Sequence, residues 1–403
     1  MKRAVVITGV GLVTPLGANP EEVLQRLQAG ETVAAPPVHF DASPFSCPVC
    51  AEVKGFDPEQ FVPDPKTVRL MNRDGLFAAA AARLALDNAR LAVGKDYAGE
   101  EIALFGATGL AGMRLDEVAP LIRHSAAADG GFDARRFGSE ALKRIRPILS
   151  FKILSNMPIC FVSIFEGIRG PNTIYNPWEG QGARAIGRGI AAVRRGEAPC
   201  ALVGGCDAKA HALAFTSLEE AGVFRSWREQ GQGAVPGEGA AFLVLEAEDR
   251  ARARGVRILA RAVGAGFCTV TEVPHGTDAS ARPFGATAAR ETRLGSTLET
   301  FRTAVAGTGP GAQVILVSGE EGDGLNQRAE EQALQALGIT AGEALRPKVH
   351  AGNLFAAAAA LQVGLAATLA SAHGAGAKVL AACFGHGSEQ AAFLLEGVGE
   401  AAE

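Results

Sequence analysis

The sequence has no concentration of positive charge. It holds 39 Lys and Arg against 43 Asp and Glu, which gives a formal net charge of −4, and the two signs are interspersed along the chain. It therefore offers neither a basic stripe for nucleic acid nor a polybasic helix for a membrane surface. We expect its partners to be small molecules or proteins, with no nucleic acid and no membrane among them.

Long uninterrupted apolar runs are missing as well. No segment reaches the roughly 18 consecutive apolar residues of a membrane-spanning helix. The apolar run near the N-terminus is short and broken by Gly and Pro, so it fits a buried first strand better than a signal peptide. We expect a cytoplasmic protein. Low-complexity tracts large enough to form a linker are also missing.

Cysteines in a zinc-binding arrangement are lacking too. Only Cys47 and Cys50 have ligand spacing, and no second pair stands at a comparable spacing, so we expect no metal site. We expect no cofactor either. Most of the cysteines lie in apolar segments, which is typical of buried free thiols in a reducing compartment. The seven are Cys47, Cys50, Cys160, Cys200, Cys206, Cys268 and Cys383.

Apolar segments bounded by glycine alternate with helical patterns along the whole chain. With 403 residues, 48% of them hydrophobic, the chain is long enough to bury a large core. The alternation predicts a layered α/β protein whose strands are largely buried. Strands are expected at 4–8, 102–105, 201–203, 241–245, 314–317 and 379–382.

Two Ala-rich segments, 75–94 and 354–374, are apolar on nearly every face, which is typical of helices at the centre of a fold. A charged connector at 246–257 separates them. We therefore predict two similar halves, residues 1–250 and 251–403. The polar segment 125–140 is predicted to be an exposed excursion.

A glycine-rich loop at 105–112 follows a predicted strand and is similar to a dinucleotide phosphate loop. Such a loop normally opens the first strand–helix–strand unit, whereas this one begins about 100 residues into the chain. No acidic residue that ends a second strand stands at the spacing of the ribose contact. Nucleotide binding is therefore disfavoured.

A longer stretch of the sequence, residues 167–208, gives a more specific pattern than this loop. Residues 167–208 read GIRGPNTIYNPWEGQGARAIGRGIAAVRRGEAPCALVGGCDA, in which a small-residue turn carries an apolar strand into an amphipathic helix. Together with VVITGVGLVTPLG (5–17), PGEGAAFLVLE (236–246) and CFGHGSEQAAFLLE (383–396), this segment resembles the β-ketoacyl synthases of the condensing-enzyme family. Several motifs in the family's order make this resemblance far more specific than any one motif.

The resemblance implies a doubled thiolase-like fold, layered α-β-α-β-α, a dimer, and an acyl carrier protein as the substrate carrier. It also implies a Cys-His-His site. In such a site a thiolate at a helix N-terminus takes the acyl chain as a thioester. The two imidazoles stabilise the enolate formed when a malonyl unit loses carbon dioxide.

None of these three groups stands at its expected position. Counted from the flanking motifs, the nucleophile position is Glu179, the first His position is Gly319 and the second is Asn353. Lys348, which belongs to the second His motif, is retained. A carboxylate cannot hold an acyl chain as a thioester, and Asn supplies a hydrogen bond but no imidazole chemistry. Condensation by this chain alone is not expected.

The resemblance then indicates a chain-length factor, the homologue without a nucleophile that pairs with an active ketosynthase in type II polyketide systems. Such a pair shares an acyl tunnel, and Leu110, Met113 and Trp178 are candidate tunnel and interface residues. Ordinary core packing is the alternative for all three. Glu179 differs from the commonest residue at its position, Gln, so aryl-polyene or other reduced-polyene pathways are an alternative setting. We expect Glu179 to have a structural role, paired with a cation such as Lys348 or with helix amides.

Two enzymatic alternatives remain open. One is a malonyl-ACP decarboxylase, or a ketosynthase homologue with altered chemistry, although family members of that type keep the histidines. In the other, Cys206 or Cys268 has become the nucleophile. Both cysteines are more simply explained as buried small residues.

Overall fold

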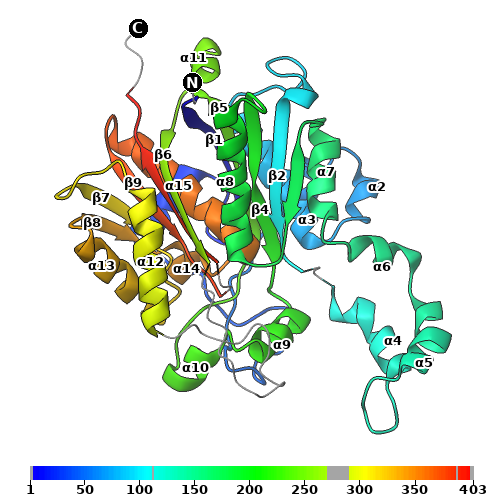
Figure 1. Cartoon of the computed structure of the whole chain (residues 1–403). Helices are drawn as coiled ribbons and strands as arrows, with labels where there is room; N and C mark the ends of the chain where they lie inside the picture. Colours follow the sequence, from blue (N-terminus) through cyan, green and yellow to red (C-terminus); the bar gives the residue numbers. More distant parts are fainter. Residues whose placement is uncertain (1–2, 111–112, 270–289, 387–388, 400–403) are drawn as a thin grey trace.

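The computed structural model describes residues 3–110, 113–269, 290–386 and 389–399. Within these ranges ten strands form a mixed sheet in the order β3-β2-β4-β5-β1-β6-β10-β9-β7-β8 (Figure 1). The strands are β1 (Val5–Val13), β2 (Ile102–Thr108), β3 (Asn172–Tyr175), β4 (Cys200–Ala208), β5 (Glu238–Ala247), β6 (Ala260–Thr269), β7 (Gln313–Val317), β8 (Thr340–Leu345), β9 (Lys378–Cys383) and β10 (Glu389–Glu396).

The sheet is a doubled structure. In one half β1, β5 and β4 are antiparallel neighbours, and β4, β2 and β3 then run parallel. In the other half β6, β10 and β9 are antiparallel, and β9, β7 and β8 run parallel. A short antiparallel pairing of β1 with β6 joins the halves. The two halves therefore share one topology, although the predicted division into 1–250 and 251–403 stays a prediction.

Helices cover both faces of the sheet, which confirms the α/β class. The two helices α8 and α15 pack on each other between the halves, while α3 packs on β1 and β5 and α12 packs on β6 and β10 (Figure 1). The helices are α1 (Pro20–Gln28), α2 (Pro65–Val68), α3 (Arg73–Asn88), α4 (Leu115–Ser125), α5 (Ala134–Arg136), α6 (Pro147–Lys152), α7 (Met157–Glu166), α8 (Glu179–Arg195), α9 (Ala212–Glu220), α10 (Arg225–Gln230), α11 (Glu248–Ala253), α12 (Arg290–Ala304), α13 (Leu325–Ala336), α14 (Pro347–Ala351) and α15 (Ala358–His373). Single helical turns are η1 (Pro58–Gln60), η2 (Gly99–Glu101), η3 (Phe137–Ala141), η4 (Leu142–Arg144) and η5 (Phe355–Ala357).

The first strand is longer than the 4–8 predicted from the sequence. β1 continues through Gly9 and Gly11 to Val13. Helix α3 packs closely on it at these glycines. A Cβ on Gly11 would lie 2.0 Å from the carbonyl oxygen of Ala81 in α3. These glycines permit a close helix–strand approach and do not mark the end of the strand.

The Ala-rich segment at 354–374 forms the central helix of the molecule. Residues Phe355–His373 are long and apolar enough to cross a membrane by length and composition, but 89% of that window is buried inside the protein. This burial is what an all-round apolar helix at the centre of a soluble fold requires. The segment is therefore part of the core here.

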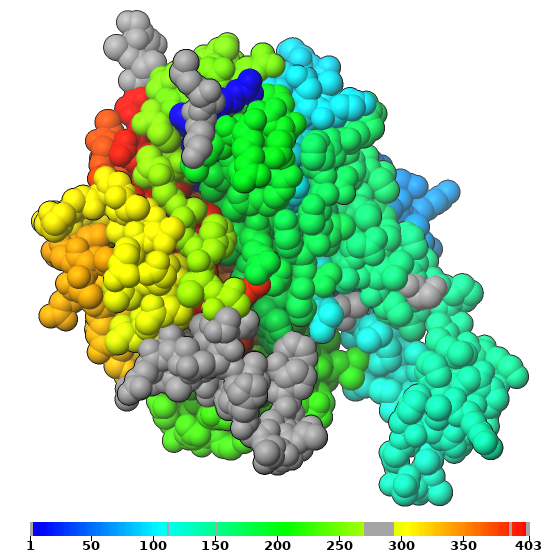
Figure 2. Space-filling model, in the orientation of Figure 1, coloured from blue at the N-terminus to red at the C-terminus, as the bar shows by residue number. Residues whose placement is uncertain are grey.

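Residues 113–156 form an arm that stands away from the body, with α4 and α5 at its outer end (Figures 1 and 2). The predicted excursion at 125–140 lies within this arm. Large apolar side chains on it are exposed, among them Phe132 (68%) and Ile122 (52%). Apolar side chains exposed in such number on one projecting segment are typical of an interaction surface.

The structure also describes the two motifs considered for metal and nucleotide binding, the Cys47–Cys50 pair and the segment 105–112. Cys47 and Cys50 are buried free thiols, and burial raises the pKa of each to about 12. The segment predicted to be a glycine-rich loop, 105–112, begins inside β2, which continues to Thr108, and its residues 111–112 lie outside the described ranges. A Cβ on Gly109 would lie 2.2 Å from the Asp207 carboxylate. The segment therefore packs against Asp207, which is ion-paired with Lys209.

Candidate functional site

Glu179 is the first residue of α8, directly after the turn that follows β3. Trp178 precedes it in extended conformation and is the N-cap residue of the helix. The Gly-rich sequence allows the first turn of α8 to lie against the start of the central helix: a Cβ on Gly182 would stand 2.5 Å from the carbonyl oxygen of Ala356. A carboxylate at this end of a helix is stabilised by the helix dipole.

The Glu179 side chain is buried, with 2% of its surface exposed. Asn353 Nδ2 donates to its Oε1 at 2.7 Å, and His386 Nδ1 lies 3.2 Å from the same oxygen. Its Oε2 has no hydrogen-bond partner among the described residues. Gly385 lies directly against it, since a Cβ on Gly385 would stand 2.5 Å from Oε2. The structure thus brings two predicted site positions, Glu179 and Asn353, into direct contact.

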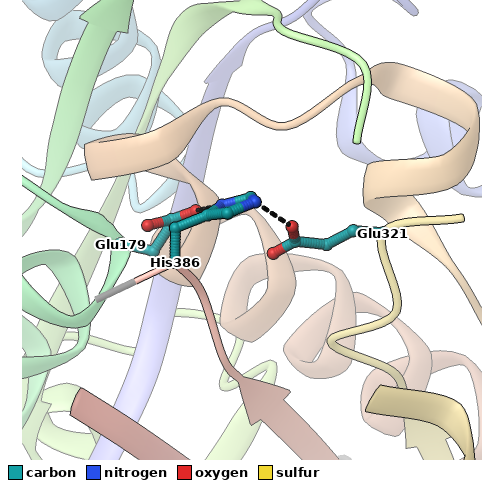
Figure 3. Close-up of side chains that lie close together, drawn as sticks. All are labelled: Glu179, Glu321 and His386. Carbon is teal, nitrogen blue, oxygen red and sulfur yellow. Dashed lines mark hydrogen bonds and ion pairs between the residues drawn. The ribbon is translucent and has the colours of Figure 1, made fainter. Parts of the chain in front are cut away.

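His386 connects Glu179 to a second buried carboxylate (Figure 3). Its Nε2 lies 3.2 Å from Oε2 of Glu321, in the loop between β7 and α13. Lys348 Nζ, from α14, lies 2.6 Å from the other oxygen of Glu321 and also donates to the carbonyl of Phe384. The retained lysine therefore pairs with Glu321, and the direct cationic partner of Glu179 is His386, not Lys348 as expected.

These neighbours set the protonation of the site. Burial alone would raise the pKa of Glu179, but the hydrogen bond from His386, the charge of Lys348 and the bond from Asn353 hold that pKa well below its usual value. Burial opposes the charged form of His386, yet Glu321 and Glu179 raise its pKa. Burial likewise opposes a charged Lys348, and the same two carboxylates raise its pKa. Glu179, Glu321, Lys348 and His386 form a quartet in which the two carboxylates favour the charged forms of Lys348 and His386.

Gly319, the first predicted His position, is closely packed. A Cβ there would lie 3.1 Å from the Ala382 carbonyl oxygen and 3.2 Å from the Phe384 side chain. Its amide instead donates to Glu330 Oε1 at 2.7 Å, and its carbonyl accepts from Asn326 Nδ2 at 2.8 Å. Burial raises the pKa of Glu330 to about 7. Gly319 is therefore part of the hydrogen-bond network of its own loop and is not among the hydrogen-bond partners of Glu179.

The quartet has the ligand types of a metal site but not the charge of one. Suitable atoms of Glu179, Glu321 and His386 lie within 4.8 Å of one another. However, both ring nitrogens of His386 already face carboxylates, and Lys348 already neutralises Glu321. A divalent cation would add positive charge to a buried group whose charges balance, which is costly. We assign no metal to it.

The alternative cysteine nucleophiles do not lie in this site. Burial raises the pKa of the Cys206 thiol well above its ordinary value, and the nearby carboxylates of Asp74 and Asp207 raise it further. Cys268 is half-buried on β6. Cys206 is therefore a protonated core thiol in β4, and neither residue is among the partners of Glu179.

The three candidate tunnel residues differ in their surroundings. Leu110 is 63% exposed, Met113 is half-buried at the start of the arm, and the Trp178 ring lies 6.2 Å from that of Phe355. A cavity of about 980 Å³ opens between the arm and the body. None of the three lines it. Its apolar lining on the arm comes from one face of α4, namely Leu115, Ala119 and Ile122.

Sequence reasoning did not identify His386 or Glu321 as site residues. Both stand in segments that it did single out, the C-terminal glycine loop and the loop of the first His position. Two features of the sequence could have identified them. One is the histidine inside the C-terminal glycine loop, and the other is the acidic pair Glu320 and Glu321 directly after Gly319, the first predicted His position. Their contact joins residues far apart in the chain, which local patterns do not report.

Comparison with known proteins agrees with this architecture. Residues 2–251 match the family described as beta-ketoacyl synthase, N-terminal domain. The 3-oxoacyl-[acyl-carrier-protein] synthase 2 of Synechocystis is 30% identical over 274 residues, which cover 65% of this chain and 62% of that protein. The enzyme of the same name from Vibrio cholerae is 30% identical over 277 residues, covering 66% and 63%. The match therefore spans less than two thirds of these relatives.

Solved structures show the same fold over nearly the whole chain. The ishigamide ketosynthase/chain length factor superposes with a TM-score of 0.77 at 24% identity, covering 99% of this chain and 100% of that one. A beta-ketoacyl synthase from Burkholderia phymatum gives 0.73 at 20% identity, covering 99% and 100%. These likenesses confirm the doubled thiolase-like fold. With the family match over residues 2–251, they lead to one conclusion: the chain belongs to the β-ketoacyl synthase family.

Proposed function

We propose that this chain is a non-catalytic subunit that pairs with an active β-ketoacyl-ACP synthase and shapes the acyl tunnel of the heterodimer. The observation that carries the proposal is the buried carboxylate of Glu179 at the nucleophile position, held by Asn353 and His386. A type II polyketide, aryl-polyene or related fatty-acid-like pathway is the setting. We place the protein in the cytoplasm.

The chemistry of the quartet opposes acyl loading. A carboxylate that attacked a thioester would form a mixed anhydride, which hydrolyses readily. Glu179 is also a poor nucleophile here, because its neighbours hold its pKa low and its oxygen Oε1 accepts two hydrogen bonds. No thiol replaces it among the partners described above. Condensation therefore depends on the Cys of the partner.

Decarboxylation is the second candidate and is less well supported. A malonyl group would bring a further carboxylate to a site that already contains Glu179 and Glu321. The imidazole that could stabilise an enolate, His386, has both nitrogens facing these two carboxylates. Decarboxylation by the isolated chain that is lost in Glu179→Ala would favour this candidate.

Two surface features support pairing with a homologue. Strand β3 lies at the end of the sheet and, among the described residues, is hydrogen-bonded only to β2. An edge strand of this kind is a template for pairing with another chain. The second feature is exposed apolar surface: Ile164 on α7 is 68% exposed, and Leu154, which precedes α7, is 47% exposed.

The structural neighbours support the same pairing. One is itself a ketosynthase/chain length factor, and another holds a type II acyl-carrier protein in complex with its ketosynthase. We infer that a carrier protein also serves this pair.

The proposal is tested by co-expression with the ketosynthase that shares its pathway. We expect an equimolar heterodimer whose condensing activity is abolished when the partner's Cys is replaced and retained in Glu179→Ala. Activity that survives loss of the partner's Cys and disappears in Glu179→Ala would reject the non-catalytic role. Size-exclusion chromatography of both variants is the control, since each must still form the heterodimer.

A further inference from the structure

An aromatic side chain, Phe355, lies beside the nucleophile position and is completely buried. Phe355 opens η5, the turn directly before the central helix α15, and this turn packs on α8. Its ring lies 6.2 Å from that of Trp178, the residue directly before Glu179. It also lies 6.4 Å from the imidazole of His386, which contacts the Glu179 carboxylate. Phe355 therefore occupies the space next to two neighbours of Glu179.

The position of Phe355 is fixed by polar groups around its backbone and ring. Its φ is +46°, in the left-handed region that residues with a side chain rarely adopt. Its N–H donates to Oδ1 of Asn353 at 2.8 Å, while Nδ2 of Asn353 donates to Glu179. Lys209 Nζ lies 6.0 Å from the centroid of the ring, within range of a cation–π contact. A strained backbone of this kind persists where the surroundings over-determine it, and such positions gather at functional sites.

Phe355 also belongs to a hydrophobic cluster that reaches the cavity between the arm and the body. Phe40 and Ala210 pack against this cluster, and both line the cavity of about 980 Å³. On the side of the candidate site, Trp178 packs against the same cluster and precedes Glu179. Apolar side chains therefore run from the cavity to the nucleophile position. An acyl chain that extended along this route would contact apolar groups, as ligands of that class do in their pockets.

We propose that Phe355 is a specificity-determining residue whose ring blocks the apolar route between the cavity and Glu179. A hydrocarbon-like acyl chain in the cavity is thereby kept away from the nucleophile position of this chain. The inference rests on the proposed function, in which this chain holds no acyl group. It adds that the exclusion is steric as well as chemical, so that a thiol at position 179 would still not be reached by an acyl-sized molecule.

The test places a thiol at position 179 of the purified full chain, in Glu179→Cys and in the double variant Glu179→Cys/Phe355→Ala. The probe is octyl methanethiosulfonate. The thiolate attacks its sulfenyl sulfur, a disulfide to the octyl chain forms, and methanesulfinate leaves. Peptide mass mapping reports the modification of position 179 separately from that of the seven native cysteines. We expect modification at least about tenfold faster in the double variant, because a buried thiol is inert until a reagent reaches it.

A matched control separates this block from general loosening of the core. Phe301 is as completely buried as Phe355 but belongs to a different cluster. In Glu179→Cys/Phe301→Ala, the thiol at position 179 should stay as protected as in Glu179→Cys. Phe355→Leu, which shortens the side chain but keeps it apolar, replaces Phe355→Ala if the alanine variant does not fold, and should give an intermediate rate. Circular dichroism checks the fold of each variant, and labelling in urea confirms that the thiol is present.

Equal rates of octyl modification with and without the Phe355 ring, whether fast or slow, would overturn the block. Modification of the Phe301→Ala control as fast as that of the Phe355→Ala variant would also overturn it, since the effect would then not belong to Phe355. The ketosynthase takes no part in these reactions, and position 179 carries an introduced thiol. Failure of the block is therefore a separate result from failure of the non-catalytic role, which replacement of the partner's Cys tests.

Discussion

A carboxylate, Glu179, stands at the start of α8, and the charges around it explain how it can be buried. Glu179 has Asn353 and His386 as partners, and Glu321 has Lys348. A buried ion pair is not by itself a source of stability, but removing one member leaves an uncompensated charge in the interior. The quartet therefore makes each of its members structurally necessary once the others are present.

The stability of the fold is predicted to depend strongly on Lys348, whose side chain is 1% exposed. Lys348→Met leaves Glu321 buried without its lysine, so we expect the free energy of unfolding to fall by about 3–5 kcal/mol. Urea denaturation measures this change. Arg302→Met is the matched control, because it removes an ion pair to Glu299 at a site where both side chains are more than half exposed. That control should lose less than about 1 kcal/mol. A similar small loss in Lys348→Met would contradict the structural role of the quartet.

At the level of single residues, the sequence predicted which positions lie together better than it predicted their contacts. The motif order placed Glu179 and Asn353 in one site, and they are hydrogen-bonded. Family motifs specify backbone positions, so this success follows from the shared fold. The partner of Glu179 was not predicted correctly, because a charge pair between residues 179 and 386 depends on how two loops meet in space.

Among the elements, α4 has the most direct bearing on chain length under the proposed function. Its residues 115, 119 and 122 lie on one helical face, because positions separated by three and four residues are neighbours on a helix, and all three line the cavity beside the arm. Met71 and Leu76 line it from the side of α3. Under the proposed function, this face is a more direct candidate wall than Leu110, Met113 or Trp178, none of which lines the cavity.

Filling this cavity is predicted to shorten the products of the heterodimer. Ala119→Phe adds an aromatic ring to the lining, so we expect the maximum chain length to fall by a few carbons without loss of pairing. Mass spectrometry of the released products measures it. Leu121→Phe is the matched control on the same helix, since Leu121 does not line the cavity. Leu110→Phe and Met113→Phe test the walls predicted from the sequence. Equal product lengths in Ala119→Phe and wild type would exclude α4 as a wall.

The elements were predicted well where burial dictates the pattern and poorly at their ends. The predicted strand at 201–203 is the centre of β4, which extends over Cys200–Ala208. Glycines at 204 and 205 suggested an end, but the strand continues because the central helix lies against it: a Cβ on Gly205 would stand 2.3 Å from the Ala356 carbonyl oxygen. Strand β3 is short and half-exposed, so its apolar pattern is weak.

On the scale of the whole molecule, the candidate site is built from both halves of the doubled fold. The first half contributes Glu179, and the second contributes Glu321, Lys348, Asn353 and His386. The sequence indicated two similar halves from their Ala-rich helices, but the matching strand order became visible only in three dimensions. Under the proposed function, loss of the catalytic groups involved positions in both halves.

The central claim is that this chain contributes shape, not a nucleophile, to a condensing pair. Intact-protein mass spectrometry after incubation with an acyl-charged carrier protein tests it most directly, on the isolated chain and on the heterodimer. We predict an acyl adduct on the ketosynthase partner and an unchanged mass for this chain in both samples. A covalent acyl group on this chain when it is incubated alone would contradict the account.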